Sequence, residues 1–242
     1  MATPRPSLAE LASRLPGRVV LGTDTTEPGE AGALQPTGWA ELDERIGGLP
    51  RGRLSELLGA ASSGKLSLLL SMLRRVLAPP EGEPGLAALV DLSGSVFPRG
   101  AWAEGRLLVV RPIELPEALR ALDVLAASAS FDLLALEVSG HLPARGLPEA
   151  VAVRLARLAR ETGTTITACA DRSAFGSLAA SRLQLSGTSD GRLHAAVRKN
   201  RRGALAEATL ERPGLPYSIA AALRKRARAE VLPFAARAGC AS

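Results

Sequence analysis

Residues 59–67 read GAASSGKLS and follow the phosphate-loop pattern G-x-x-x-x-G-K-[S/T] at every position except the last. In such a loop the glycines let backbone N–H groups turn toward phosphate oxygens, the lysine adds a positive charge, and the final hydroxyl binds Mg²⁺. Leu66 occupies the hydroxyl position, and Ser67 comes one residue later, about 100° further around the following helix. We therefore expect a phosphate cradle that lacks its metal ligand.

Nucleotide-binding candidates lie in this degenerate loop and at one carboxylate later in the chain. They are Gly59, Ser62, Ser63, Gly64, Lys65 and Ser67 in the loop region, and Glu137. Lys65 either contacts phosphate, or caps carbonyl oxygens or bonds to Glu137. Glu137 either binds a metal ion or forms a structural ion pair with Lys65. ATP is therefore a possible ligand but not a required one. No metal ion is expected, and no residue is assigned a catalytic role.

Strand-like and helix-like patterns alternate along the chain. Residues 53–58 predict a strand that enters the loop, and residues 65–77 predict a helix that is apolar on nearly all sides, as in a helix buried against a sheet. Four further apolar runs predict strands at residues 86–91, 107–110, 133–138 and 164–170. Helical periodicity separates the last three of these runs, at residues 116–127 and 148–161.

This alternation predicts an α/β fold with a mainly parallel sheet and helices on both of its faces. Beyond residue 180 the pattern changes to short runs separated by glycine-containing turns. These runs, at residues 182–185, 193–197 and 206–210, predict antiparallel strands at the edge of the sheet.

Three segments are predicted along the chain: an N-terminal helix and linker (1–36), a core (37–212) and a basic C-terminal tail (213–242). Within the first segment, residues 7–15 begin with a serine cap and carry a glutamate three residues on, which indicates a short capped helix. Residues 22–36 are rich in Gly, Thr, Glu and Pro and indicate a linker. A second short helix is expected at residues 39–46, where a Gly-Gly pair closes it.

Positive charge is concentrated at the end of the chain. Residues 1–191 hold 19 Lys and Arg against 21 Asp and Glu, whereas residues 192–242 hold 11 against 3. Such a segment favours an acidic partner, either nucleic acid or an acidic protein face, or else it is a solvated strand edge followed by an unstructured tail. Four basic residues of the tail are candidates for contact with DNA phosphates: Arg224, Lys225, Arg226 and Arg228. The same residues could equally form a solvated helix end.

Composition excludes several classes of protein. Aromatic residues make up only 3% of the chain, which argues against an aromatic platform for single-stranded nucleic acid. Cys169 and Cys240 lie far apart and form no metal-ligand spacing, so a reduced intracellular chain is expected. The sequence contains no apolar stretch of membrane length and no signal-peptide core. We therefore expect a cytoplasmic protein with no membrane partner.

The residues that lead into the loop resemble the RecA/Rad51 superfamily of strand-exchange ATPases, and RecA more than its other members. Thr37-Gly38 is followed by Leu42-Asp43, and residues 47–57 then read GGLPRGRLSEL. The loop residues 62–65, SSGK, match the same pattern. The resemblance is close over residues 37–67 and continues in element order to about residue 211. It implies a RecA-like core for residues 37–212.

Three departures from the superfamily pattern affect groups that serve the same reaction, phosphoryl transfer. Leu66 replaces the loop hydroxyl, Ser93 stands where RecA-like enzymes carry the glutamate that activates water, and Glu137 replaces the aspartate of the Walker-B strand. Each change removes or displaces a group that phosphoryl transfer needs for metal placement or water activation. The resemblance therefore implies a degenerate ATPase site. The alternative is a slow DNA-stimulated ATPase in which Ser67 and Glu137 serve as metal ligands.

The loops depart from the pattern as well. RecA-like recombinases hold single-stranded DNA with two long loops, whereas the corresponding connections here, residues 139–146 and 171–181, are short. Strand exchange of the RecA type is therefore not expected. Residues 199–201, KNR, resemble the basic segment that RecA presents to the nucleotide of the neighbouring protomer, which makes Lys199 and Arg201 interface candidates.

A core of this size with a degenerate loop, short DNA loops and a basic tail resembles the ImuA family, whose members are accessory factors of the bacterial inducible-mutagenesis cassette. The resemblance implies a pseudo-ATPase adaptor in the SOS response, acting in DNA-damage-induced translesion synthesis. Its implied partners are RecA and an ImuB-like, polymerase-related protein. The helix expected at residues 7–15 could then dock on RecA as a mimic or a filament cap. A DNA-binding module that acts through the basic C-terminus is a further alternative.

Overall fold

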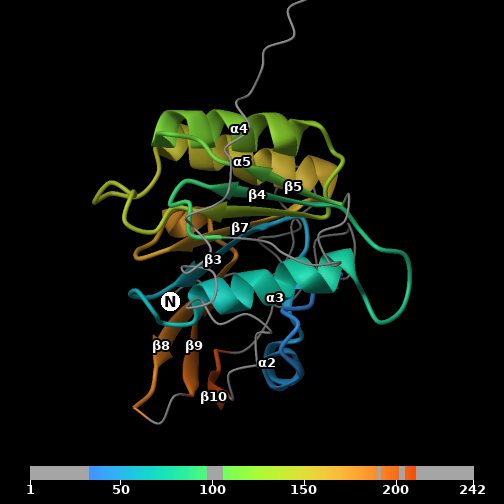
Figure 1. Ribbon diagram of the computed structural model, residues 1–242, viewed down its shortest axis with the longest axis vertical. Coiled ribbons are helices and arrows are strands. Elements are labelled where there is room, and N and C mark those ends of the chain that lie inside the picture. Colours follow the sequence, from blue (N-terminus) through green and yellow to red (C-terminus); the bar gives the residue numbers. More distant parts are fainter. Residues whose placement is uncertain (1–32, 97–105, 190–191, 202–204, 211–242) are drawn as a thin grey trace, which may run out of the picture.

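The structure of the chain is a computed structural model that describes residues 33–96, 106–189, 192–201 and 205–210 (Figure 1). The helix expected at residues 7–15 lies outside these ranges. The basic tail also lies outside them, with its candidates Arg224, Lys225, Arg226 and Arg228. What the sequence predicts for these two segments therefore stays a prediction.

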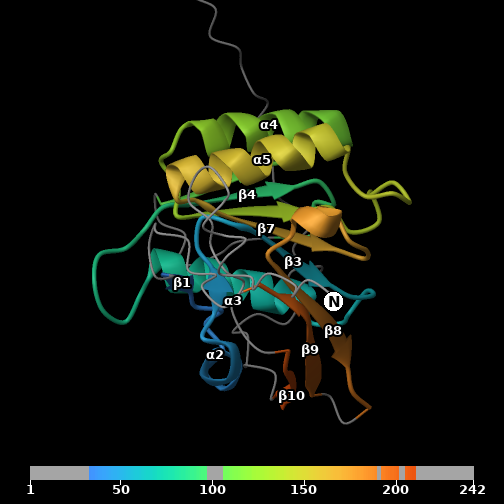
Figure 2. The ribbon, with the colours of Figure 1, turned by 180° about the vertical axis from the view of Figure 1, so that it is seen from behind.

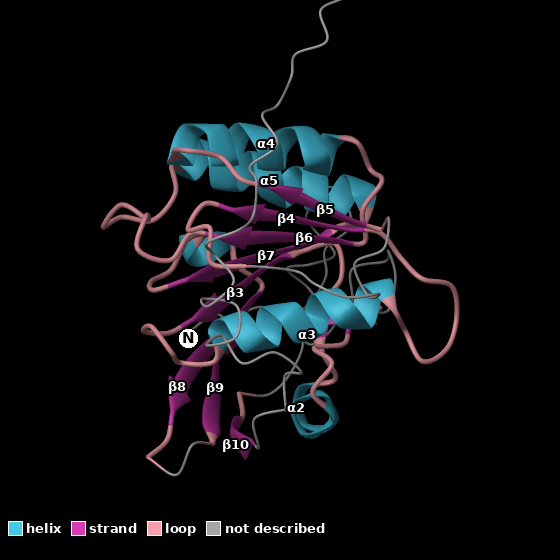
Figure 3. Cartoon of the chain, in the orientation of Figure 1, coloured by secondary structure: helices cyan, strands magenta, loops and turns pink. Residues whose placement is uncertain are grey.

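An eight-stranded mixed sheet forms the centre of the described residues (Figure 3). Its strands are β3 (Leu54–Leu58), β4 (Ala87–Asp91), β5 (Leu107–Val110), β6 (Leu133–Glu137), β7 (Thr165–Ala170), β8 (Ser181–Gly187), β9 (Leu193–Asn200) and β10 (Glu207–Leu210). Across the sheet their order is β10-β9-β8-β3-β7-β6-β4-β5. Neighbouring strands from β8 to β5 are parallel, and β9 and β10 are antiparallel to their neighbours. The predicted fold class is confirmed.

Strand β8 adds a detail that the sequence pattern did not predict. It pairs antiparallel with β9, as expected for this part of the chain, but it pairs in parallel with β3. The sheet therefore changes direction between β8 and β9, and β8 is an internal strand rather than part of the edge.

Helices cover both faces of the sheet, as Figures 1 and 2 show from opposite sides. Helix α3 (Lys65–Leu77) packs on one face, and α4 (Leu115–Ala127) and α5 (Glu149–Thr162) pack together on the other. Successive side chains of a strand point to opposite faces, so Leu57 joins the core under α3 while Leu54 and Leu58 join the core under α4 and α5. In the described part of the chain no helix has the length and apolar character needed to cross a membrane.

The residues before β3 form a small unit of their own. Helix α2 (Ala40–Ile46) ends at Gly47, whose φ of 73° lies in the left-handed region that favours glycine. The N–H groups of Thr37 and Gly38 donate to the Asp43 carboxylate and fix the entry into the helix. Strand β1 (Leu34–Gln35) pairs antiparallel with β2 (Leu49–Pro50). Since β1 falls within the segment predicted as a linker, regular structure begins before residue 37.

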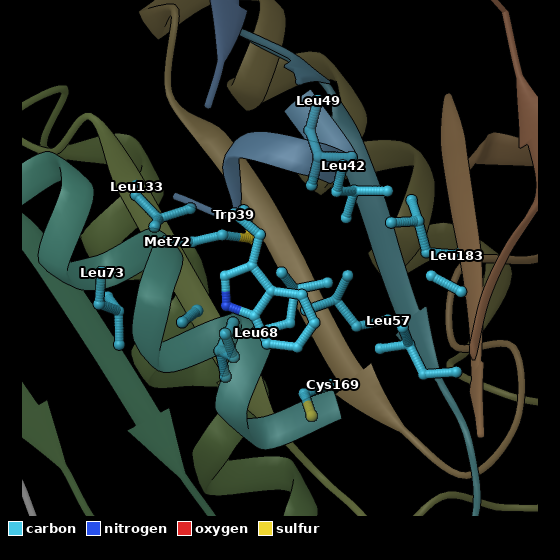
Figure 4. Packing of buried hydrophobic residues seen from close by; sticks show 14 of the residues in the cluster. Trp39, Leu42, Leu49, Leu57, Leu68, Met72, Leu73, Leu133, Cys169 and Leu183 are labelled. Carbon is cyan, nitrogen blue, oxygen red and sulfur yellow. The ribbon is translucent and has the colours of Figure 1, made fainter. Parts of the chain in front are cut away.

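Trp39 anchors this unit to the core under α3. Its side chain is buried and lies beside Leu68 and Met72 of α3 (Figure 4). The indole N–H has no hydrogen-bond partner among the described residues. An unpaired buried donor costs about 1–3 kcal/mol, so the apolar contacts of the ring hold it in place.

Glu56 is a fully buried carboxylate on the face of β3 that α5 covers. Its oxygens accept hydrogen bonds from the Phe175 N–H at 2.6 Å, the Ser173 hydroxyl at 2.9 Å and Nε of Arg182 at 2.5 Å. The Arg182 guanidinium also donates to the carbonyl of Gly176, which begins the 3₁₀ turn η2 (Gly176–Leu178). A buried charge is stable only when it is paired, so these bonds hold the connection between β7 and β8 against the sheet.

Replacing Arg182 by leucine is expected to destabilise the fold. Glu56 then loses its cation, and breaking a buried ion pair in this way costs about 3 kcal/mol. Urea unfolding followed by far-UV circular dichroism measures the change. The double variant Glu56→Gln/Arg182→Leu is the matched control, and it should recover part of the loss because no buried charge remains. A single variant as stable as the unaltered chain would contradict this role for the pair.

Candidate phosphate-binding site

The carboxyl ends of the parallel strands carry a row of polar groups on the face that α3 covers. Asp91 ends β4, Glu137 ends β6, and Cys169 lies next to the end of β7; the strand register places the three side by side. All three are buried. Burial raises the pKa of the Cys169 thiol far above its ordinary value, and the Glu137 carboxylate adds to this effect. Ligands of open α/β sheets bind beyond this end of the strands, so the row and the adjoining loop form the candidate site.

The loop between β3 and α3 is tightly packed. Gly64 has a φ of 89°, and an added Cβ would lie 2.3 Å from Cδ1 of Leu193. At Gly59 an added Cβ would lie 2.4 Å from both the Ser63 hydroxyl and the Leu185 carbonyl oxygen. Both positions therefore require glycine. The Ser63 hydroxyl is buried and has no hydrogen-bond partner among the described residues, and it faces Gly59 across the loop.

Lys65 is buried and binds three oxygens. Its Nζ donates to the carbonyl oxygens of Gly59 at 2.7 Å and Ala60 at 3.0 Å, and to Oδ1 of Asp171 at 3.2 Å. The lysine therefore caps loop carbonyls, as one of the three expected alternatives states, but its carboxylate partner is Asp171 rather than Glu137. The reason is topological. Asp171 follows β7, which adjoins β3, whereas Glu137 ends β6, one strand further away.

Asp171, in the connection after β7, bonds both to the lysine of the phosphate loop and to the connection between β6 and α5. Its Oδ1 accepts from Lys65, and its Oδ2 accepts from the Gly140 N–H at 2.6 Å, in the connection between β6 and α5. Partial burial raises the pKa of Asp171, but the hydrogen bonds from Gly140 and Lys65 outweigh that effect, so its pKa lies below the ordinary value. The carboxylate is therefore charged at neutral pH and forms an ion pair with Lys65.

The superfamily resemblance implies a Mg²⁺ ion at this site, and the residues present do not fit one. Leu66 packs against the core under α3 and offers no oxygen. Oε1 of Glu137 accepts from the Ser139 N–H at 3.2 Å, which leaves one buried carboxylate oxygen, Oε2, without a partner among the described residues. Within the described ranges no three His, Cys, Asp or Glu side chains lie close enough together to hold a metal ion. At a phosphate loop, Mg²⁺ is held by one or two protein oxygens together with water and phosphate, and the loop hydroxyl among these ligands is missing here.

The position expected to hold the water-activating residue is bound into its own turn. The Ser93 hydroxyl donates to Oδ1 of Asp91 at 3.2 Å and bonds to the Ser95 hydroxyl at 2.7 Å. The Asp91 carboxylate also accepts the N–H groups of Ser95 and Val96. Asp91 therefore organises the turn after β4. Ser93 is a far weaker base than the glutamate expected in an active enzyme.

The interface candidates Lys199 and Arg201 lie together but away from the loop. Both donate to the carbonyl oxygen of Ser177, at 2.8 Å and 3.0 Å. The register of β9 brings them to the start of β8, whereas the phosphate loop follows the other end of β3. Partial burial lowers the pKa of Lys199, and the charge of Arg201 lowers it further. The two cations therefore form a basic pair that is separate from the loop of the same chain.

Sequence reasoning missed Asp171 and the Glu56–Arg182 pair. A signal for Asp171 existed, because it directly follows an apolar strand and therefore lies at the same end of the sheet as Glu137. No such signal marks Glu56, whose partners lie more than 100 residues later in the chain.

The fold and the loop together define an α/β protein with a phosphate loop between its central strand and the helix that follows. A family model described as the RecA N-terminal domain matches residues 21–150, which is more than half of the chain. The chain belongs to this RecA family.

Several curated relatives are RecA proteins of bacteria. The RecA proteins of Leifsonia xyli subsp. xyli and Paenarthrobacter aurescens are each 37% identical to this chain over 123 residues, and that of Frankia casuarinae is 36% identical over the same length. The alignments cover 48% of this chain and 32%, 33% and 34% of the respective relatives. The chain therefore spans about a third of the length of the relatives it matches.

Asp171 should make the stability of the chain depend on acidic pH. Its pKa is lower in the folded chain than in the unfolded chain, so its stabilising contribution is complete above the unfolded value and is lost as the pH falls through the folded value. The unfolded pKa is about 4, so the unaltered chain should lose its advantage over Asp171→Asn below about pH 4. Urea unfolding of both chains across the acidic range measures this difference. Parallel pH profiles would rule out the assignment.

Proposed function

We propose that this chain is a cytoplasmic adaptor of the RecA family and a pseudo-ATPase, which acts with RecA and an error-prone polymerase complex in DNA-damage-induced translesion synthesis. The single observation that carries the proposal is Leu66, which packs against the core where an active loop offers a hydroxyl to Mg²⁺. The resemblance to the ImuA family supplies the cellular role and an ImuB-like protein as a second partner.

The chemistry of the site supports a pseudo-ATPase. Phosphoryl transfer depends on metal placement and on a positioned water molecule. Ser93 is bound to Asp91 and Ser95, and Lys65 is neutralised by Asp171. The hydroxyl ligand for the metal is therefore missing, and Ser93 and Lys65 are already bonded within the chain.

One connection of the sheet supports an adaptor rather than a recombinase. The connection between β7 and β8 is short and is fixed by Glu56, by Asp171 and by the basic pair that binds the Ser177 carbonyl. A fixed connection of this length does not supply the long loop with which recombinases hold DNA. The basic pair, Lys199 and Arg201, lies near the start of β8 and is the candidate contact with a neighbouring RecA-type core.

A slow DNA-stimulated ATPase is the second candidate function. The buried oxygen Oε2 of Glu137 favours it, because this oxygen has no partner among the described residues and could serve as a metal ligand together with Ser67. The two candidates differ in whether hydrolysis occurs at all.

Purified full-length chain should hydrolyse ATP no faster in the presence of Mg²⁺ and single-stranded DNA than without protein. Release of phosphate measures this directly, with RecA as the positive control and Lys65→Ala as the matched variant. Both the unaltered chain and the variant should give the background rate. Turnover that depends on DNA and disappears in Lys65→Ala would favour the second candidate instead.

The adaptor role predicts a physical complex. Tagged full-length chain should retain RecA and the ImuB-like protein of the same organism on an affinity column. We expect the double variant Lys199→Ala/Arg201→Ala to retain less RecA, because the basic pair is the proposed contact. Arg157→Ala/Arg160→Ala, which removes the same charge from the exposed face of α5, is the control and should retain as much as the unaltered chain. Failure to retain either partner would refute the adaptor role.

A further inference from the structure

The Lys65 ammonium has no spare hydrogen-bonding capacity. An ammonium group has three donors, and here they meet three acceptors: the carbonyl oxygens of Gly59 and Ala60 and the carboxylate of Asp171. A phosphate group that approaches the lysine must therefore replace one of these partners.

Asp171 is the partner that can leave. The two carbonyl oxygens belong to the backbone of the loop, so releasing either one would require the loop itself to change shape. The Asp171 side chain is 37% exposed, whereas that of Lys65 is 8% exposed. Its bond to the lysine, at 3.2 Å, is also the longest of the three. A carboxylate can turn toward water without disturbing the loop.

Other groups at this position suit an oxyanion. The N-terminus of α3 has no side-chain cap, and such an end attracts negative charge. The Ser63 hydroxyl, in a residue that is 4% exposed, faces the interior of the loop with no partner among the described residues. Leu66 replaces the hydroxyl that would bring a metal ion with the phosphate.

We propose that the Asp171 carboxylate occupies the place of a phosphate at Lys65, and that a phosphate group can displace this carboxylate from the lysine without a metal ion. The metal-free character of the exchange rests on the proposed function, whereas the exchange itself does not. Exchange breaks the bond from Asp171 to Lys65 and draws the carboxylate away from the Gly140 N–H, which donates to its other oxygen. Phosphate binding thereby loosens the connection between β6 and α5.

Inorganic phosphate in the presence of EDTA is the probe. Calorimetry should show that Asp171→Asn binds phosphate about fivefold more tightly than the unaltered chain, since an exposed or partly exposed ion pair is worth up to about that factor. Asparagine keeps an acceptor for Gly140 but carries no charge to compete for Lys65. Glu161→Gln, which removes the same charge from an exposed pair on α5, is the control and should bind as the unaltered chain does.

A second readout needs no variant. In the unaltered chain, phosphate should speed hydrogen exchange at the Gly140 amide, measured by NMR, because that N–H loses its carboxylate acceptor. Parallel titrations with metal-free ATP and with a 5′-phosphorylated oligonucleotide show which source of phosphate binds best.

Three results would overturn the exchange: no phosphate binding in EDTA, equal affinity of Asp171→Asn and the unaltered chain, or unchanged Gly140 exchange at saturating phosphate. Each is independent of ATP hydrolysis and of RecA retention, so failure of the exchange and failure of the proposed function remain distinguishable.

Discussion

The Lys65 ammonium is the charge around which the loop region is built. It belongs to the first residue of α3, reaches back to the carbonyls of Gly59 and Ala60, and reaches across to Asp171 after β7. A charge in buried surroundings is tolerated only when it is fully bonded. The bonds of this one side chain therefore join the loop, the first turn of α3 and the connection after β7.

A second buried charge, Glu56, lies on the opposite face of the sheet and has its own partner in Arg182. Glu56 points from β3 toward α5, while Lys65 lies on the side of α3. The connection between β7 and β8 serves both, because it gives Asp171 to the lysine and the Ser173 hydroxyl and Phe175 N–H to the glutamate. This connection is short and bonds to both buried charges, so it belongs to the framework of the fold.

Local features of the sequence predicted much of this fold. The helix at residues 65–77 appears with the predicted bounds, and the apolar runs at 107–110 and 133–138 appear as β5 and β6, because periodicity and glycine placement act over a few residues. The partner of Lys65 and the parallel pairing of β8 depend instead on which distant strands become neighbours. That order arises from the packing of the whole sheet, so local patterns could place Asp171 at the right end of the sheet but could not pair it with Lys65.

Leu66 couples the chemistry of the loop to the stability of the core. Its side chain packs against the core under α3, so a change to threonine would remove apolar contacts and cost about 1–2 kcal/mol before any metal could bind. A hydroxyl introduced at this position alone therefore lowers the stability of the chain, while the Ser93 hydroxyl stays bonded to Asp91 and Ser95. A substitution in the core under α3 that regains these contacts would offset the cost, so residue 66 and the core must change together for a hydroxyl to be gained without a loss of stability.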